Sequence, residues 1–546
     1  MLQDTKLNIV LLICITLLAG VLRFWQITQV PPSLYWDEVS QAYNAYSILA
    51  TGKDEHQEFL PLARFQAFGD YKAPVNIYLT VISMLIFGRN DFAIRFPSAF
   101  LGTLTVVLTY FLVRELFAKS SLSKTIALFS AFLLSISPWH IQLSRAAYEG
   151  NIATFFTVSS LFLFFYALNK RPWFILISAI SFVIAFYAFN AHRVFIPLFV
   201  LFLSLIFFRK LWGIKKQVIF SILIGLVMLI PYIIFFQTPE SKLRFQEVNI
   251  FSDLETIKKA NQLIADDGST LIAKLIHNRR VLFAREYLIN YFDFFNPNYL
   301  FFEGDINPRF SHRFNGQLFL WILPFILVGI YGLYSIKNKT TLVLLGWILL
   351  APIPAAVARE TPHALRSETF IPVFEIIAAV GISFWLIYLN HKAKRFVPII
   401  LVLLGMISIF SVVAFWHNYT VHNPKIFSAD WQYGYKDAVE YIDSIDDKYD
   451  AIYFTTEYGR PYIYVAWYGR IAPEEYWSKA NVVKDSFGFY NVLSLGKYQF
   501  VENPPAFAKN KVLYVFSENK IPKNSRILKK IYFLNGNIAF VIAENT

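Results

Sequence analysis

Long apolar runs, separated by short charged segments, constrain the fold of this chain more than any other feature of its sequence. Eleven runs come close to the roughly 20 residues that a helix needs to cross a bilayer. They lie at 7–27, 93–114, 123–140, 150–168, 173–189, 193–208, 216–236, 316–335, 340–357, 369–389 and 396–416. Hydrophobic residues make up 56% of the 546 residues and charged residues only 16%, which excludes a soluble globular protein. The sequence predicts a polytopic α-helical membrane protein.

Clusters of Lys and Arg fall between alternate runs, for example at 209–216 and 391–395. Basic loops of this kind stay on the cytoplasmic side of a membrane, so we expect a cytoplasmic N-terminus and an extracytoplasmic C-terminus. The same loops account for the net charge of +13 without a nucleic-acid partner. The apolar stretch 74–88 is interpreted as an interfacial helix, because a crossing there would turn every later basic loop outward.

The runs also predict a division into domains. Residues 1–421 form the transmembrane domain, with long outer loops at 28–92 and 237–315, and residues 422–546 form a small soluble domain outside the membrane. In that tail, helix-like and strand-like periodicity alternate, which predicts an α/β fold. The single cysteine, Cys14, excludes an intrachain disulfide.

An acidic pair, Asp37-Glu38, follows the first apolar run directly. A carboxylate at the mouth of a membrane helix is costly to keep there and therefore indicates a function, although a solvated loop acid is the ordinary alternative. Other polar residues are expected at the outer ends of the helices: Asp70, Tyr71, Lys72, Arg145, Glu149, His192, Arg193, Asp305, His363 and Arg366. Such a rim suits a ligand with an anionic head and an apolar tail. A lipid-headgroup anchor is the alternative for each Arg and Lys. Glu375, inside an apolar run, is interpreted either as the partner of Arg366 within a helix or as a proton-handling group, and the pair is the favoured expectation.

Several motifs occur in a characteristic order. They are Asp37-Glu38, Lys72-Ala73-Pro74, the segment 87–99 (FGRNDFAIRFPSA), Ser137-Pro138-Trp139-His140 with Ser144-Arg145, and Pro362-His363-Ala364-Leu365-Arg366. This order resembles the superfamily of protein mannosyltransferases and aminoarabinose transferases, over about residues 1–420. Ala73 stands where a second proline is usual, and Glu149 stands where an aspartate is often found.

The resemblance implies a GT-C fold and an inverting glycosyltransferase that uses a polyprenyl-phosphate sugar. The acceptor would be a hydroxyl of a protein, lipid or glycan at the extracytoplasmic face of a prokaryotic plasma membrane. Asp37 would be the general base, and Glu38 would orient Asp37 or bind the acceptor. Together with the polar rim, this predicts phosphate-binding residues Lys72, Arg145, Arg366 and His363, and substrate- or sugar-binding residues Asp70, Tyr71, Glu149, His192, Arg193 and Asp305. No cofactor is certain; a divalent metal, with Glu149 as a ligand, remains open.

Three other functions compete with this interpretation. A glycan polymerase or ligase that uses a diphosphate-linked lipid would share the long outer loop and the basic rim, but it does not require the acidic pair. A lipid or sugar transporter would show paired repeats and polar groups in mid-run, whereas this sequence has no evident repeat and one mid-run acid. A non-catalytic scaffold that binds partners through its tail is the third alternative.

Overall fold

The computed structural model describes residues 5–68, 70–336, 338–485, 488–505 and 511–545. Its internal contacts divide the chain into two compact units. Unit 1 comprises residues 1–23, 100–144 and 149–415, and unit 2 comprises residues 24–99, 145–148 and 416–546. Helices α4 (Asp91–Leu116) and α18 (Val397–His417) contribute to both units, as does α1 (Thr5–Phe24) through its last residue.

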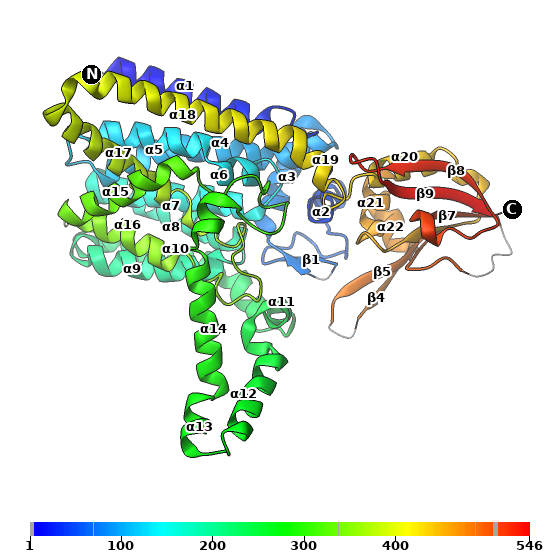
Figure 1. Ribbon diagram of the computed structural model, residues 1–546. Coiled ribbons are helices and arrows are strands. Elements are labelled where there is room, and N and C mark those ends of the chain that lie inside the picture. The colour runs from blue at the N-terminus through cyan, green and yellow to red at the C-terminus, as the bar shows by residue number, and fades with distance from the viewer. Residues whose placement is uncertain (1–4, 69, 337, 486–487, 506–510, 546) are drawn as a thin grey trace. The chain divides into compact units, whose positions relative to one another are not determined.

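Unit 1 consists mainly of long apolar helices that lie side by side (Figure 1). Besides parts of α4 and α18 they are α1 (Thr5–Phe24), α5 (Ser123–Ile136), α6 (Pro138–Ser144), α7 (Glu149–Asn169), α8 (Phe174–Ala188), α9 (His192–Gly213), α10 (Lys215–Phe236), α15 (Leu323–Ile336), α16 (Lys339–Leu350) and α17 (Val373–Lys392). Seven of the described helices are long and apolar enough to cross a membrane, and α5 with α6, bent by 57°, makes an eighth candidate.

Each of the eleven predicted apolar runs overlaps one of these helices or the bent pair. The chain is therefore a multi-pass, mainly helical membrane protein, as the composition predicts. The number of crossings stays a prediction, because α8, α15 and α16 are among the shorter apolar helices. The interfacial stretch at 74–88 is also a short apolar helix, α3 (Pro74–Phe87).

Glycines allow α15 and α17 to pack closely. A Cβ atom on Gly381 would lie 1.9 Å from the carbonyl oxygen of Phe325, and one on Gly329 would lie 2.0 Å from that of Ile377. Because lipid tails are as apolar as leucine, close backbone approach at small residues is a main source of stability between such helices. Both positions therefore require glycine.

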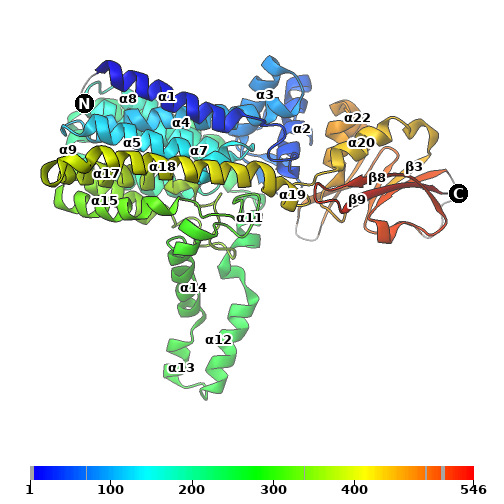
Figure 2. The same cartoon turned by 45° about the horizontal axis from the view of Figure 1, so that its top comes forward.

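The predicted outer loop 237–315 of unit 1 forms short helices rather than irregular coil. They are α11 (Glu240–Val248), α12 (Leu254–Asp266), α13 (Leu271–Ile276) and α14 (Arg279–Asp293). Side chains at their starts accept backbone hydrogen bonds, Asp253 from Glu255, Thr270 from Ala273 and Asn278 from Arg280, as N-caps usually do. Helices α12 to α14 project from the helical bundle as an arm (Figure 2).

Unit 2 combines the first outer loop with the C-terminal tail. The loop contains α2 (Trp36–Thr51), β1 (Phe65–Ala67), β2 (Asp70–Lys72) and α3. The tail contains α19 (Asn423–Phe427), α20 (Tyr435–Asp443), β3 (Ala451–Thr455), α21 (Pro461–Tyr468), α22 (Pro473–Lys479), β4 (Ala480–Lys484), β5 (Tyr490–Leu495), β6 (Tyr498–Val501), β7 (Val512–Phe516), β8 (Ser525–Tyr532) and β9 (Ile538–Asn545). Its seven strands form one sheet in the order β4-β5-β6-β3-β7-β9-β8. β3 pairs in parallel with β6 and β7, and the other described pairs of this sheet are antiparallel, so the α/β prediction for the tail is confirmed.

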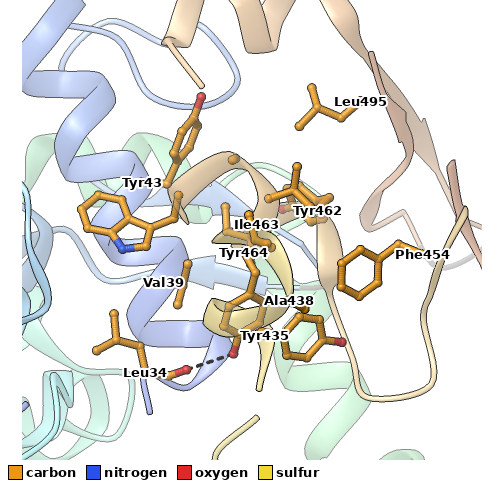
Figure 3. Packing of buried hydrophobic residues seen from close by; sticks show 14 of the residues in the cluster. Leu34, Val39, Tyr43, Tyr435, Ala438, Phe454, Tyr462, Ile463, Tyr464 and Leu495 are labelled. Atoms are coloured by element: carbon orange, nitrogen blue, oxygen red, sulfur yellow. Dashed lines mark hydrogen bonds between the residues drawn. The ribbon is translucent and has the colours of Figure 1, made fainter. Parts of the chain in front are cut away.

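The loop and the tail share one hydrophobic core (Figure 3). Val39 of α2, Ala438 of α20 and Ile463 of α21 are completely buried in it. The hydroxyl group of Tyr464 donates a hydrogen bond to the carbonyl oxygen of Leu34, 3.0 Å away and just before α2. The tail thus supports the loop that carries Asp37. The domain boundary near residue 422 stays a prediction.

Candidate active site

Helix α2 begins where the acidic pair lies. The backbone N–H of Tyr35 donates to Glu38 Oε2 at 3.0 Å, which satisfies a donor that the first helical turn leaves without a partner. Asp37 and Glu38 both lie in this first turn, where the positive end of the helix dipole favours carboxylates. Local sequence therefore explains why two acids start this helix, but their environments differ sharply.

Glu38 is sealed inside unit 2, with 1% of its surface exposed. Its Oε1 accepts hydrogen bonds from Arg95 Nε at 2.9 Å and from the Ala147 N–H at 3.0 Å. Its Oε2 accepts from Arg95 Nη2 at 3.0 Å in addition to the Tyr35 N–H. With four donors around two oxygens, this carboxylate is fully engaged in holding the chain together.

Arg95, on α4, completes this arrangement and is itself fully buried. Its Nη1 donates to the carbonyl oxygens of Ile27 and Pro31, each at 2.8 Å, and its Nη2 donates to that of Ser33 at 2.5 Å. One guanidinium thus fixes both Glu38 and the segment that leads into α2. Sequence reasoning did not assign Arg95 a role; the available signal was a charge inside an apolar run, which requires a partner.

Asp37, in contrast, is partly open. Lys72 Nζ donates to Asp37 Oδ1, and 32% of the Asp37 side chain but only 7% of the Lys72 side chain is exposed. Lys72 ends β2, where it pairs with Phe65 of β1, and Pro74 at the start of α3 follows at once. The hairpin therefore brings the predicted base and a predicted phosphate-binding residue together from positions 35 residues apart.

The turn 145–148 is clamped against the same elements. Asn76 Nδ2 donates to Gln41 Oε1 and, at 3.0 Å, to the carbonyl oxygen of Ala147. Arg145 is fully buried, and its Nη2 donates to the carbonyl oxygens of Trp25 and Val30 at 2.7 and 2.8 Å. These contacts give Arg145 a structural task; its predicted phosphate-binding role stays a prediction.

The remaining predicted residues of unit 2 lie on the β1–β2 hairpin. Tyr71 is buried, and the guanidinium of Arg64 lies 5.7 Å from the centre of its ring. Asp70 begins β2, and its side chain lies outside the described part of the structure.

In unit 1 three other predicted residues come together from two loops. Asp305 Oδ2 accepts a hydrogen bond from the Ala364 N–H at 2.6 Å and lies 3.8 Å from His363 Nδ1. Burial raises the pKa of Asp305 to about 6, against the opposing effect of hydrogen bonds from the Ala364 and Asn307 amides and of the Arg366 charge. The Asp305 carboxyl group is therefore partly protonated near pH 6.

The predicted pair between Arg366 and Glu375 is wrong. Arg366 Nη2 lies 4.0 Å from Glu360 Oε2, and its Nη1 donates to the Glu360 carbonyl oxygen at 3.3 Å. Glu375 is buried in the first turn of α17, and no ion pair joins it to Arg366 within the described residues. The prediction assumed continuous helix between the two residues, but the helix begins only at Val373.

The other predicted residues of unit 1 lie at the starts of helices. Glu149 begins α7 and is half-buried. His192 begins α9 and is buried between the rings of Phe189 and Phe195, at centroid distances of 6.1 and 6.0 Å. Arg193 lies over the ring of Tyr232 at 4.9 Å. Their substrate roles stay predictions.

A divalent ion needs several converging ligands, usually carboxylates, histidines or cysteines. Among the residues that the structure describes, no group of three such side chains has this arrangement. Glu149 as a metal ligand therefore stays a prediction, and no step proposed below passes through a metal.

A second acidic group of unit 2, Asp54 and Glu55, follows α2 in the sequence. Glu55 is buried, and burial together with the neighbouring Asp54 carboxylate raises the pKa of Glu55 to about 8, against Asn44 and Lys72. Burial also raises the pKa of Asp54 to about 6 and lowers that of His56 to about 4. His56 Nε2 lies 3.6 Å from Glu55 Oε1.

These shifts predict a pH-dependent stability. Between pH 6.5 and 8, Glu55 is the one member of this trio that is largely protonated when folded, down to about half at pH 8, and ionised when unfolded. A raised carboxyl pKa means stability that is lost as pH rises, here by at most about 1.4 kcal/mol per pH unit. Denaturant unfolding of the purified protein at pH 6.5 and 8 should show this loss in the wild type and a flatter profile in Glu55→Gln. Equal slopes in the two proteins would contradict the assignment.

The sequence is similar to a known protein family and to two curated proteins. Residues 13–249 match the family model described as dolichyl-phosphate-mannose-protein mannosyltransferase. YkcB of Bacillus subtilis, named for an inferred mannosyltransferase activity, is 27% identical over 171 residues, which cover 31% of this chain and 22% of that protein. An uncharacterized protein of Aquifex aeolicus is 35% identical over 104 residues, 19% of this chain and 20% of that protein. The chain thus matches only about a fifth of the length of these curated relatives.

Solved structures extend the likeness to the whole chain. ArnT from Cupriavidus metallidurans in the apo state has a TM-score of 0.54 and 12% identity, with 98% of each chain covered. The same protein bound to undecaprenyl phosphate has a TM-score of 0.52 and 12% identity, with 100% of this chain and 99% of that chain covered. At such low identity the likeness concerns the fold. The chain has the GT-C fold of membrane glycosyltransferases, and its N-terminal part is similar to the protein mannosyltransferases.

Proposed function

We propose that the protein is an inverting membrane glycosyltransferase that moves a sugar from a polyprenyl phosphate to a hydroxyl acceptor. One observation carries the proposal: a solvent-accessible carboxylate, Asp37, is held at a helix start beside an enclosed ammonium group, Lys72. The similarity to mannosyltransferases supports a lipid-linked mannose as the first donor to test. The likeness in fold to ArnT, whose structure holds undecaprenyl phosphate, supports a polyprenyl carrier.

In the proposed reaction Asp37 accepts the proton of the acceptor hydroxyl as its oxygen attacks the anomeric carbon. The bond between that carbon and the phosphate oxygen breaks, its electron pair goes to the phosphate, and polyprenyl phosphate leaves. A phosphate leaves as a stable anion, so it needs a nearby cation more than a second acid. The ammonium group of Lys72 has three donors and can contact Asp37 and a phosphate oxygen together.

Glu38 is proposed as a positioning residue rather than a second base. Of the two roles considered for it, orientation of Asp37 agrees with its four hydrogen bonds, whereas binding of an acceptor would require some of them to break. Arg366, His363 and Asp305 form a second polar group that we propose binds the donor head, with Arg366 as its cation.

The proposed site faces the extracytoplasmic side of a prokaryotic plasma membrane, where nucleotide sugars are absent and lipid-linked sugars serve as donors. This orientation follows from the basic loops, with the N-terminus in the cytoplasm. The acceptor is a hydroxyl of a protein, lipid or glycan. The membrane contributes to donor binding, since each buried methylene of the tail contributes about 0.8 kcal/mol.

Replacing Lys72 by Ala should raise the apparent KM for the donor. Loss of one charge-assisted hydrogen bond to the phosphate corresponds to an increase of about 10- to 100-fold. Lys436→Ala is the matched control, because this lysine also forms an ion pair with an aspartate of unit 2, Asp91, at 3.2 Å. A normal donor KM in Lys72→Ala and in Arg366→Ala would remove the phosphate role from both residues.

Gly459 of the tail should influence turnover through Trp36. A Cβ atom on Gly459 would lie 2.2 Å from the Trp36 ring, next to Asp37 in sequence, and its φ of 121° already disfavours other residues. Overpacking of this kind costs about 1–3 kcal/mol. Gly459→Ala should lower kcat more than it changes the donor KM. Gly536→Ala is the control, since its φ is 88° but a Cβ there meets open space. Equal kcat values in the two variants would contradict a positioning role.

The proposed function is tested by incubating the purified protein in lipid vesicles with radiolabelled polyprenyl-phosphate mannose and a membrane extract as acceptor source. Transfer of label with release of polyprenyl phosphate is the expected result. A panel with other polyprenyl-phosphate sugars and with diphosphate-linked glycans identifies the donor. Transfer only from the diphosphate-linked lipids would show a polymerase or ligase, and movement of intact lipid across the vesicle membrane without transfer would show a transporter.

A further inference from the structure

The projecting arm of unit 1, residues 253–293 with helices α12, α13 and α14, has no role in the proposed reaction. Its base is tied to the segment that follows α16. Asn290 Nδ2 donates to the carbonyl oxygens of Ala356 and Ala358 at 3.2 and 3.0 Å, and the Tyr291 hydroxyl donates to that of Leu349 at 2.8 Å. Since Leu349 is next to the last residue of the apolar helix α16, the arm starts at the level where that helix ends.

From this base the arm extends across the direction of the long helices of unit 1, rather than continuing along it (Figures 1 and 2). Long apolar helices cross the membrane, so an element that runs across them at the level of their ends lies along the membrane surface. Such an element meets lipid headgroups on one side. We therefore ask whether the exposed side chains of the arm suit contact with lipids.

The arm exposes apolar side chains that a water-exposed loop would not keep. On α13 the four residues Leu271, Ile272, Leu275 and Ile276 are exposed to between 57% and 75%. On α14 the apolar side chains at turn spacing are Val281, Leu288, Ile289 and Phe292, each about half exposed or more. The latter line a groove of about 810 Å³ that reaches Pro297. Both helices thus carry exposed apolar side chains.

Four cations fall in the segment 268–285 of the arm, and acids flank this segment at Asp266, Asp267 and Glu286. Lys274, Arg279, Arg280 and Arg285 lie between residues 268 and 285, and no acidic residue occurs there. The preceding acid, Asp267, is held by His277, with Oδ2 and Nε2 2.9 Å apart. Apolar side chains flanked by Lys and Arg are typical of helices that lie in the interface of an anionic membrane.

We propose that α13 and the exposed face of α14 bind the membrane surface, with the apolar side chains among the acyl chains of anionic lipids and the four cations at their headgroups. Anionic lipid is the occupant that matches both the exposed apolar side chains and the four cations of residues 268–285. Each cation near an anionic leaflet shifts the equilibrium toward the lipid-bound arm by about fivefold. The arm then acts as a lateral anchor of unit 1.

The test uses full-length protein in nanodiscs of phosphatidylcholine with or without phosphatidylglycerol. Cys14, the single cysteine, is replaced by Ser, and an environment-sensitive fluorophore is attached to Leu275→Cys or Ile289→Cys. Gln262→Cys, an exposed polar position on α12, is the matched control. Nitroxide-labelled lipids report contact with acyl chains, and iodide reports contact with water. A further variant replaces Lys274, Arg279 and Arg280 by Gln.

With phosphatidylglycerol, labels at 275 and 289 should be quenched by nitroxide lipids and shielded from iodide, and the label at 262 should show the reverse. The charge variant should lower lipid contact in the anionic nanodiscs and leave it unchanged in the neutral ones. Equal iodide quenching at 275 and 262 would overturn the proposal. Shielding that appears only when two protein copies share a nanodisc, or only when polyprenyl phosphate is added, would assign the surface to a second copy or to the carrier tail instead.

Discussion

Asp37→Asn should lower kcat for glycosyl transfer by about 10²- to 10⁴-fold, the contribution typical of a general base. The amide keeps the size of the side chain but cannot accept a proton from the acceptor hydroxyl. Binding of the lipid-linked donor should stay within a few-fold of wild type, because Lys72 is retained. Single-turnover kinetics together with a donor-binding assay separates the two effects.

A control variant shares the local features of Asp37 without its position. Asp91 lies in the first turn of α4 in unit 2 and forms an ion pair with Lys436 at 3.2 Å. Asp91→Asn should therefore leave kcat near that of the wild type. Unchanged turnover in Asp37→Asn, or an equal loss in both variants, would end the assignment of Asp37 as the base.

Arg95→Ala should destabilise the protein by about 3–5 kcal/mol, the usual cost of leaving a buried charge without its partner. Glu38, with 1% exposure, would lose two of its four donors, and three backbone carbonyls before α2 would lose theirs. Denaturant unfolding monitored by the tryptophans of unit 2 measures the loss.

The double variant Glu38→Gln with Arg95→Met separates the effect of losing the charges from the effect of losing side-chain volume. Removing both charges while keeping similar volumes should recover much of the stability lost in Arg95→Ala, since replacing a whole buried pair is often nearly neutral. Transfer should nevertheless remain impaired, because the carbonyls at 27–33 are no longer fixed. Wild-type stability of Arg95→Ala would contradict the structural role of this pair.

The helices and their approximate bounds could be predicted because hydrophobic length and periodicity are local properties. The α/β tail was predictable for the same reason. The contacts of the site were not, because they join distant segments: Asp37 with Lys72, and Glu38 with both Arg95 and Ala147. For Asp37 and Lys72, the predicted roles came from the resemblance to a family, because periodicity carries no information about them.

For Arg366 and Glu375, a local pattern predicted a contact that the structure does not contain. Their spacing suggested neighbours on one helix, but a 3-10 turn at Glu368–Phe370 and Pro372 separate them from a common helical geometry. The arm 253–293 lies in a segment that was predicted only as a long outer loop, 237–315. Its mixed charge hid an apolar face, because side chains three or four residues apart gather on one side only once the helix forms.

The anomeric configuration of the product tests the central claim most directly. With whichever polyprenyl-phosphate sugar supports turnover, NMR of the transferred sugar should show the configuration opposite to that of the donor. This result is required if Asp37 deprotonates the acceptor for one direct displacement. Retention of the donor configuration would mean that a group of the enzyme attacks the sugar first, and it would contradict the mechanism.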